Sequence, residues 1–180
     1  MSVFYMVEMR YPLDEDRAAF NDFYAKHISM LLTIDGFETA QRYECQHETA
    51  APFLASYRLR DEQVLERETY TARAGRNSVD PAFRAKMTNW DRNLVRGALP
   101  DMDVAPDGWL ALIDRLSLDS AALPLGFTAM EVIGLDATIT ERGVALGAHG
   151  APPDINPQPG WAVRIFRSAH STRYPKVPGR

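Results

Sequence analysis

The sequence predicts an α+β fold in which helices cover one face of an antiparallel sheet. An apolar segment at residues 2–10 has the composition of a buried strand. Apolar residues then recur at helical spacing from 20 to 34. Two further segments, 37–45 and 52–60, alternate in side-chain polarity and indicate a hairpin of two strands. The chain therefore begins as strand, helix, strand, strand.

The first strand is expected to be buried on both faces, because charge enters the segment only at Glu8 and Arg10. Pro12 ends it, and Asp14 is a plausible N-cap for the helix that follows. Gly36 ends this helix. Its apolar face consists of Phe20, Phe23, Tyr24, His27, Ile28, Leu31 and Ile34.

Residues 61–74 are rich in Glu, Arg, Ala and Leu, and their composition predicts a second helix. After a break, Asp80 and Pro81 have the pattern of an N-cap followed by proline at the first helical position. A narrow apolar stripe then predicts that this helix continues as far as residue 94. The stripe consists of Phe83, Met87, Trp90 and Leu94. Residues 109–116 predict a fourth strand.

This order, βαββαβ, is the ferredoxin-like pattern, and it places both helices on one face of a four-stranded antiparallel sheet. The other face is also apolar, so a second sheet is expected to cover it, either from a second chain or from a second half of this chain. We assign residues 1–116 to the ferredoxin-like domain. Residues 117–180 are either a degenerate second half or a β-rich extension.

The second part contains two clear strand patterns, at 127–134 and 161–168, and a weaker one at 143–148. Residues 136–142 are compatible with a helical turn. Proline and glycine make 150–160 a loop, and the tail from 171 to 180 is basic.

Composition limits the classes of function. The chain has 180 residues, a net charge of −4 and a single cysteine, Cys45. A mildly negative chain has no electrostatic footprint for nucleic acid or an anionic membrane. One cysteine excludes an internal disulfide, and no segment has the length and hydropathy of a membrane span or the pattern of a signal peptide. We expect a cytoplasmic protein.

The pattern from Phe20 through His27 to Phe37, followed by Ala40-x-Arg42-Tyr43, resembles the dimeric α+β barrel superfamily. It is most similar to the EthD-like proteins and to their relatives among muconolactone isomerases and polyketide cyclases. The resemblance covers about residues 1–116 and implies a homodimer, with a pocket between the helices and the sheet. It also implies that His27 lies near this pocket. The superfamily includes cofactor-free isomerases, cyclases and monooxygenases, haem enzymes, and proteins with no known activity.

The candidate catalytic residues are His27, Tyr5, Tyr43 and Tyr57. A neutral imidazole can take a proton from a carbon acid, and phenol groups can hold the oxygen that becomes negative. The alternative for each is structural: a buried histidine with a protein partner, and tyrosines in the core.

The candidate substrate-binding residues are Tyr24, Arg58, Phe83 and Trp90. Phe83 and Trp90 are either helix core or the apolar wall of the pocket. Arg58 is expected on the opposite sheet face, either as a clamp for a substrate carboxylate or within an interface ion-pair network. The expected members of that network are Glu8, Arg42, Glu44, Arg58 and Asp114.

The four histidines are far apart in sequence and lack the spacing of metal ligands, and no glycine-rich nucleotide loop is present. We therefore expect no metal and no cofactor. The favoured function is a cofactor-independent isomerase, cyclase or lyase acting next to a carbonyl of an aromatic, lactone or polyketide-like compound. A cofactor-free monooxygenase of a phenolic substrate and a non-catalytic ligand-binding or assembly module are the alternatives. Haem binding is a minor alternative that the colour of the purified protein would reveal.

Overall fold

The computed structural model describes residues 1–117, 122–152 and 159–176. Its strands are β1 (Ser2–Arg10), β2 (Phe37–Cys45), β3 (Phe53–Leu59), β4 (Thr88–Gly97), β5 (Trp109–Arg115), β6 (Thr128–Leu135), β7 (Glu141–Gly147) and β8 (Trp161–Ser168). Its helices are α1 (Arg17–Leu31), α2 (Glu68–Thr71) and α3 (Pro81–Arg84), with 3-10 turns η1 (Glu62–Leu65) and η2 (Arg76–Ser78).

The described strands form a closed antiparallel barrel in the order β1-β3-β2-β8-β5-β7-β6-β4. This overturns the predicted ferredoxin-like arrangement, in which an open four-stranded sheet is covered by another sheet. Here β6, β7 and β8 pair with strands of the first part and close the barrel within one chain. Every backbone edge is thereby paired, which an open sheet achieves only with a partner. The predicted homodimer stays a prediction.

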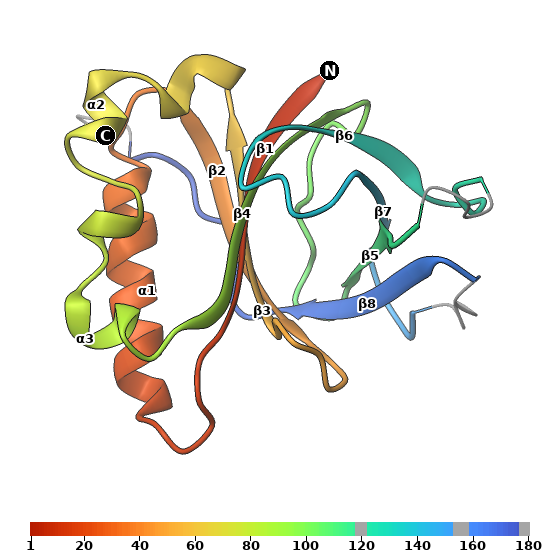
Figure 1. Ribbon diagram of the computed structural model, residues 1–180, viewed down its shortest axis with the longest axis horizontal. Coiled ribbons are helices and arrows are strands. Elements are labelled where there is room, and N and C mark those ends of the chain that lie inside the picture. Colours follow the sequence, from red (N-terminus) through yellow and green to blue (C-terminus); the bar gives the residue numbers. More distant parts are fainter. Residues whose placement is uncertain (118–121, 153–158, 177–180) are drawn as a thin grey trace.

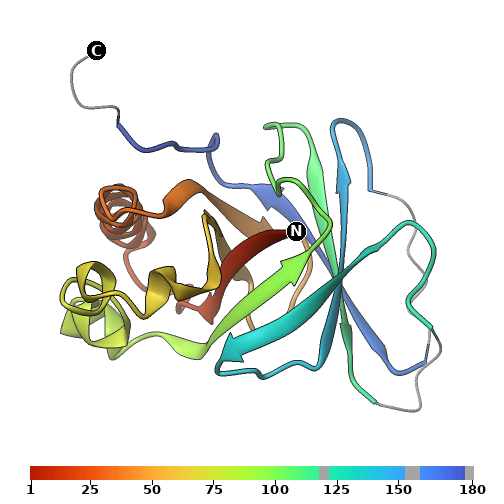
Figure 2. The ribbon, with the colours of Figure 1, turned by 90° about the horizontal axis from the view of Figure 1, so that it is seen from above.

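Helix α1 and the short helices lie together on one side of the barrel, outside β1–β4, as Figures 1 and 2 show. One apolar core fills the space between these helices and the outer face of the strands. A second core, which includes Phe4, Met6 and Leu112, fills the barrel. Strand β1 contributes alternate residues to the two cores, which confirms that it is buried on both faces.

The predicted hairpin is confirmed, because β2 and β3 pair antiparallel. Helix α1 begins two residues later than the placement of its N-cap at Asp14 predicted: Asp16 is the N-cap, and its Oδ1 accepts a hydrogen bond from the Ala19 amide at 2.9 Å. Gly36, with φ +100°, makes the turn into β2.

The second helical region is much shorter than the sequence predicted. Instead of one helix over 61–74, the chain forms η1 and α2, which are separated by Glu66 and Arg67. Asp80 does cap α3, with Pro81 in its first turn, but that helix ends at Arg84. Met87 comes just before β4, and Trp90 and Leu94 lie on it. The apolar stripe is therefore shared between a helix and a strand.

In the second part of the chain, the structure contains strands where the sequence predicted them most clearly. Strand β8 coincides with the predicted 161–168, and β6 and β7 lie close to the predicted strands. The helical turn predicted over 136–142 is absent, because Glu141 already begins β7. Most of the predicted loop at 150–160 and the end of the tail lie outside the described residues.

Candidate functional site

A small cavity lies between α1, the outer face of β1 and β3, and the short helices. Its volume is about 20 Å³, which is enough for about one water molecule. Its lining consists of Tyr5, Val7, Phe23, Tyr24, His27, Leu31, Tyr57, Tyr70, Gly75, Val79, Met87 and Trp90. Five of the eight predicted site residues therefore meet here: His27, Tyr5, Tyr57, Tyr24 and Trp90.

His27 lies on α1, beside the most buried part of its apolar face. Its ring stacks on Phe23 at 5.9 Å between centroids and meets the ring of Tyr24 edge-on at 6.0 Å. Within the described part of the chain, its imidazole makes no hydrogen bond. Burial lowers the pKa of His27 to about 4, because an apolar surrounding disfavours the charged imidazolium. The side chain is thus a neutral imidazole at physiological pH.

Phenol groups from four elements surround the cavity, and that of Tyr24 comes from α1. Tyr5 and Tyr57 are paired across β1 and β3, with ring centroids 5.6 Å apart. The hydroxyl of Tyr70, on α2, lies 3.5 Å from that of Tyr5. Burial raises the pKa of both Tyr5 and Tyr57, so each remains a neutral hydrogen-bond donor.

Tyr70 is a residue that sequence reasoning missed. It lies in the segment predicted as a long charged helix, which has no apolar face that would single it out. The only signal was an aromatic residue within a run of Glu and Arg.

Trp90 lines the cavity, whereas Phe83 does not. The indole Nε1 of Trp90 is buried and has no hydrogen-bond partner among the described residues, which leaves a free donor on a side chain that lines the cavity. Phe83 lies behind the lining, where its ring stacks on Phe23 at 4.5 Å. It supports the wall instead of forming it.

The structure does not bring Tyr43 to this cavity. Strand β2 carries a β-bulge, since Leu59 pairs with Phe37 while the adjacent Arg58 pairs with Thr39. The extra residue, Glu38, reverses which side chains face outward beyond it. Tyr43 therefore points into the barrel, where its hydroxyl donates to the Met102 carbonyl at 2.7 Å.

The bulge also divides the five charged residues that were predicted to share one sheet face. Arg42 and Glu44 face outward, toward α1. Arg58 stays on the other face, where its Nε lies 2.9 Å from Glu38 Oε2 and its Nη1 lies 3.6 Å from Asp101 Oδ2. The Arg58 side chain is half-buried at the rim of the barrel, and its ion-pair partners are not lining residues of the cavity at His27.

Glu8 and Asp114 form an ion-pair network inside the barrel with Arg142 and Arg164. The network that was expected at an interface between sheets is thus internal to one chain.

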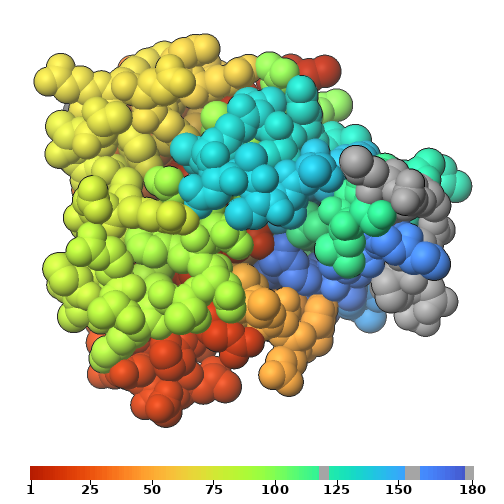
Figure 3. Space-filling view, viewed as in Figure 1, coloured from red at the N-terminus to blue at the C-terminus, as the bar shows by residue number. Residues whose placement is uncertain are grey.

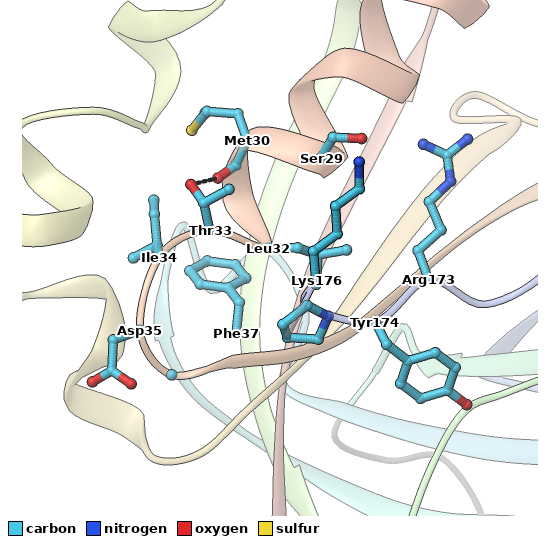
Figure 4. Close-up of a pocket in the computed structure, with 12 residues that line it drawn as sticks. Ser29, Met30, Leu32, Thr33, Ile34, Asp35, Phe37, Arg173, Tyr174 and Lys176 are labelled. Carbon is cyan, nitrogen blue, oxygen red and sulfur yellow. Dashed lines mark hydrogen bonds between the residues drawn. The ribbon is translucent and has the colours of Figure 1, made fainter. Parts of the chain in front are cut away.

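A wider groove lies at the C-terminal end of α1. Figure 4 shows its lining, which comes from the last turn of α1, the turn into β2 and the segment 173–176. Its titratable side chains, such as Asp35, lie at the surface, and Asp35 is engaged by Arg60 at 2.6 Å. The groove therefore offers less acid–base chemistry than the smaller cavity at His27.

Within the described ranges, no three His, Cys, Asp or Glu side chains are close enough to share a metal ion. The cavity at His27 is also far too small for a haem in this conformation. No helix of the described chain is long and apolar enough to cross a membrane.

Comparison with known proteins gives relatives by structure only. No family model matches the sequence, and no curated protein matches it. A structure described as an anthrone oxidase-like protein superimposes with a TM-score of 0.59 at 13% identity, covering 98% of this chain and 94% of the other. A "putative monooxygenase from Lactobacillus acidophilus NCFM" superimposes with a TM-score of 0.56 at 10% identity, covering 93% and 94%.

These two structures share the overall fold of this chain along almost its whole length. The narrower likeness to EthD-like proteins is not confirmed. At such low identity the match shows a shared fold and no shared chemistry.

Proposed function

We propose that this protein is a cofactor-independent enzyme that moves a proton at a carbon next to a carbonyl group. The observation that carries the proposal is an unbonded neutral imidazole, His27, in an apolar cavity lined by phenol groups. Isomerisation, cyclisation or lyase cleavage of an aromatic, lactone or polyketide-like compound would follow from this step.

In the proposed reaction, His27 takes the proton from the carbon, and the bonding electron pair moves onto the carbonyl oxygen. Tyr5 or Tyr57 donates a hydrogen bond to the resulting enolate oxygen, where the negative charge develops. The imidazolium then returns the proton to a different carbon, so that no atom is gained or lost. Because Tyr5 and Tyr57 are buried and His27 is half-buried, their interactions with the enolate are stronger than in water.

The small volume of the cavity sets a condition on this reaction. About 20 Å³ does not admit an aromatic ring. The cover from 62 to 87, built from short helices, therefore has to move for a substrate to enter. Figure 3 shows this yellow to green segment spread over the left side of the molecule. Entry of water with the substrate would raise the pKa of His27 toward its ordinary value and make the imidazole a stronger base.

The structural neighbours favour a second candidate, a cofactor-free oxygenase. One is described as anthrone oxidase-like and the other as a putative monooxygenase. Proton removal by His27 would again be the first step. The carbanion would then react with O₂, so that the carbon loses two hydrogens and gains one oxygen atom, and the second oxygen atom leaves as water.

Hydrogen–deuterium exchange at carbon tests the step that both candidates share. Cyclic ketones, lactones and anthrone are incubated with the protein in D₂O, and exchange is followed by NMR, with O₂ uptake recorded in parallel. We expect His27→Gln to lower the exchange rate by about 10²–10⁴-fold, the usual contribution of a general base. Exchange without O₂ uptake supports the isomerase class, and uptake supports the oxygenase.

His47→Gln is the matched control, because His47 is exposed and lies outside the cavity. Both variants are first checked for native thermal unfolding. Equal exchange in wild type and folded His27→Gln would overturn the proposal and favour a non-catalytic ligand-binding or assembly module.

A further inference from the structure

A second, more polar pocket lies on the other side of α1 from the short helices. It is enclosed by α1, the outward side of β2 and residues 169–173, and its volume is about 340 Å³. None of its lining residues belongs to the cavity at His27. Backbone hydrogen bonds between Ala40 and Arg173, at 2.9 and 3.0 Å, fix the C-terminal segment beside β2. This segment is the blue chain beyond β8 in Figure 2.

The pocket contains a buried arginine that no acid neutralises. Arg42 is only 5% exposed, and its guanidinium lies 4.3 Å from the ring centroid of Tyr24. Its Nη1 donates to Asn21 Oδ1 at 3.2 Å. No carboxylate of the described chain lies within ion-pair distance of it. Buried charges are normally paired, so this arrangement leaves an incompletely compensated cation at the wall of an open space.

A second arginine adds to this charge. Arg173 donates from Nη1 to the Ala25 carbonyl at 3.0 Å and likewise has no acid partner among the described residues. The third arginine, Arg17, is neutralised by Glu44 at 2.8 Å. With Asp22 also at the rim, the lining keeps an excess of one positive charge.

His170 supplies an unused polar atom to the same pocket. Its Nδ1 lies 2.7 Å from the Ser171 carbonyl, and because a carbonyl only accepts, Nδ1 is the donor. Its Nε2 is buried and has no partner in the described chain. Burial, together with the positive charges of Arg173 and Arg42, holds the pKa of His170 below its ordinary value.

We propose that this pocket binds a small carboxylate, with Arg42 and Arg173 as its principal ligands. A guanidinium matches the two oxygens of a carboxylate in a planar, bidentate geometry. A single excess positive charge suits a monoanion, whereas Glu44 and Asp22 would repel a dianion such as phosphate. The bound anion would also stabilise protonated His170, whose Nε2 would then donate to it.

Binding of acetate and benzoate tests this proposal. The sodium salts are titrated at constant ionic strength, balanced with chloride, and binding is followed by calorimetry and by the NMR signals of the arginine side chains. We expect saturable binding, a pKa of His170 that rises when the carboxylate is present, and at least tenfold weaker binding in Arg173→Gln and Arg42→Gln. Arg173→Gln keeps the test valid if Arg42→Gln fails to fold.

Arg84→Gln removes the same charge from an exposed position on α3 and should bind as wild type does. His27→Gln should also bind normally, so failure of the proposed catalysis is distinguishable from failure of this site. The absence of saturable binding, equal binding in all variants, or tighter binding of phosphate than of acetate would overturn the proposal.

Discussion

Burial sets the protonation state of the titratable side chains around the cavity at His27. It lowers the pKa of the imidazole and raises the pKa values of Tyr5 and Tyr57, so every one of these groups is neutral between about pH 6 and 9. A neutral base next to neutral donors is what abstraction of a carbon-bound proton requires. The same burial has a consequence for stability.

Protonation of His27 should destabilise the fold. The pKa is about 4 in the folded state and about 6.5 in the unfolded chain, so the unfolded state binds the proton first as the pH falls. The contribution of neutral His27 to the stability of the fold is therefore fully present above pH 6.5 and is lost between pH 6.5 and 4. Between pH 7 and 4.5, we expect the free energy of unfolding to fall by roughly 2–3 kcal/mol more in wild type than in His27→Phe. Urea unfolding at both pH values measures this difference, and parallel losses in the two proteins would show that His27 is not buried in solution.

At the level of the secondary-structure elements, those that follow from local sequence patterns are predictable, and those that depend on strand pairing are not. The spacing of Phe20, Tyr24 and His27 predicts α1, and the side of α1 that faces the sheet follows from it. The stripe from Phe83 to Leu94 is also spaced as a helix, yet β4 takes its second half because that segment pairs with β1 and β6. In β4 the apolar Trp90 and Leu94 are separated by polar residues only, so the segment lacks the alternation that would reveal a strand.

The bulge at Glu38 explains why the candidate site was predicted only in part. Simple alternation along 37–45 places Phe37 and Tyr43 on the same face, but one extra residue in the strand separates them. Tyr5 and Tyr57 lie on regularly paired stretches of β1 and β3, so simple alternation places both on the helix-facing side, where the structure has them. Nothing in the local sequence marks the bulge, because it depends on the register with β3.

Gly36 should be essential to the turn that sets this register. It has φ +100°, and a Cβ built on it would lie 2.5 Å from Cγ2 of the buried Val64. Gly36→Ala combines backbone strain with this clash, and we expect it to lower the free energy of unfolding by about 2–4 kcal/mol.

Gly75→Ala is the matched control, because Gly75 has φ +98° but no atom within 4 Å of the added Cβ. Strain alone should cost about 1–2 kcal/mol there. Chemical denaturation of both variants measures the difference. Equal losses would mean that Val64 moves aside and that the turn is less tightly packed than the structure shows.

At the scale of the whole molecule, the barrel depends on contacts between distant parts of the chain. Strands β2 and β8 pair across more than a hundred residues, and this pairing, with that of β4 and β6, closes the barrel. Inside it, Asp114 on β5 is held by Arg142 on β7 at 2.7 Å and by Arg164 on β8 at 2.6 Å. Glu8 on β1 contacts both arginines. The network therefore joins the first strand to the last ones across the barrel interior.

Removal of Arg142 should show how much the closed barrel depends on this network. Its side chain is 1% exposed. Burial opposes the ionisation of Glu8 and Asp114, but the two arginines outweigh it and hold both pKa values below their ordinary range. Arg142→Met leaves two buried carboxylates with one cation, and breaking a buried pair in this way costs about 3–5 kcal/mol at pH 7.

The pH dependence of this loss identifies its cause. In wild type the two lowered pKa values give stability that is present above about pH 4.5 and is lost as the pH falls further. In Arg142→Met burial should raise the pKa values, and protonation then relieves the uncompensated charge. The difference in free energy of unfolding between wild type and Arg142→Met should therefore become smaller from pH 7 to pH 4 in denaturation experiments. Arg60→Met, which breaks an exposed pair with Asp35, should leave the stability nearly unchanged at either pH. If the difference in free energy of unfolding stays constant with pH, the loss of stability in Arg142→Met comes from packing within the barrel and not from its charges.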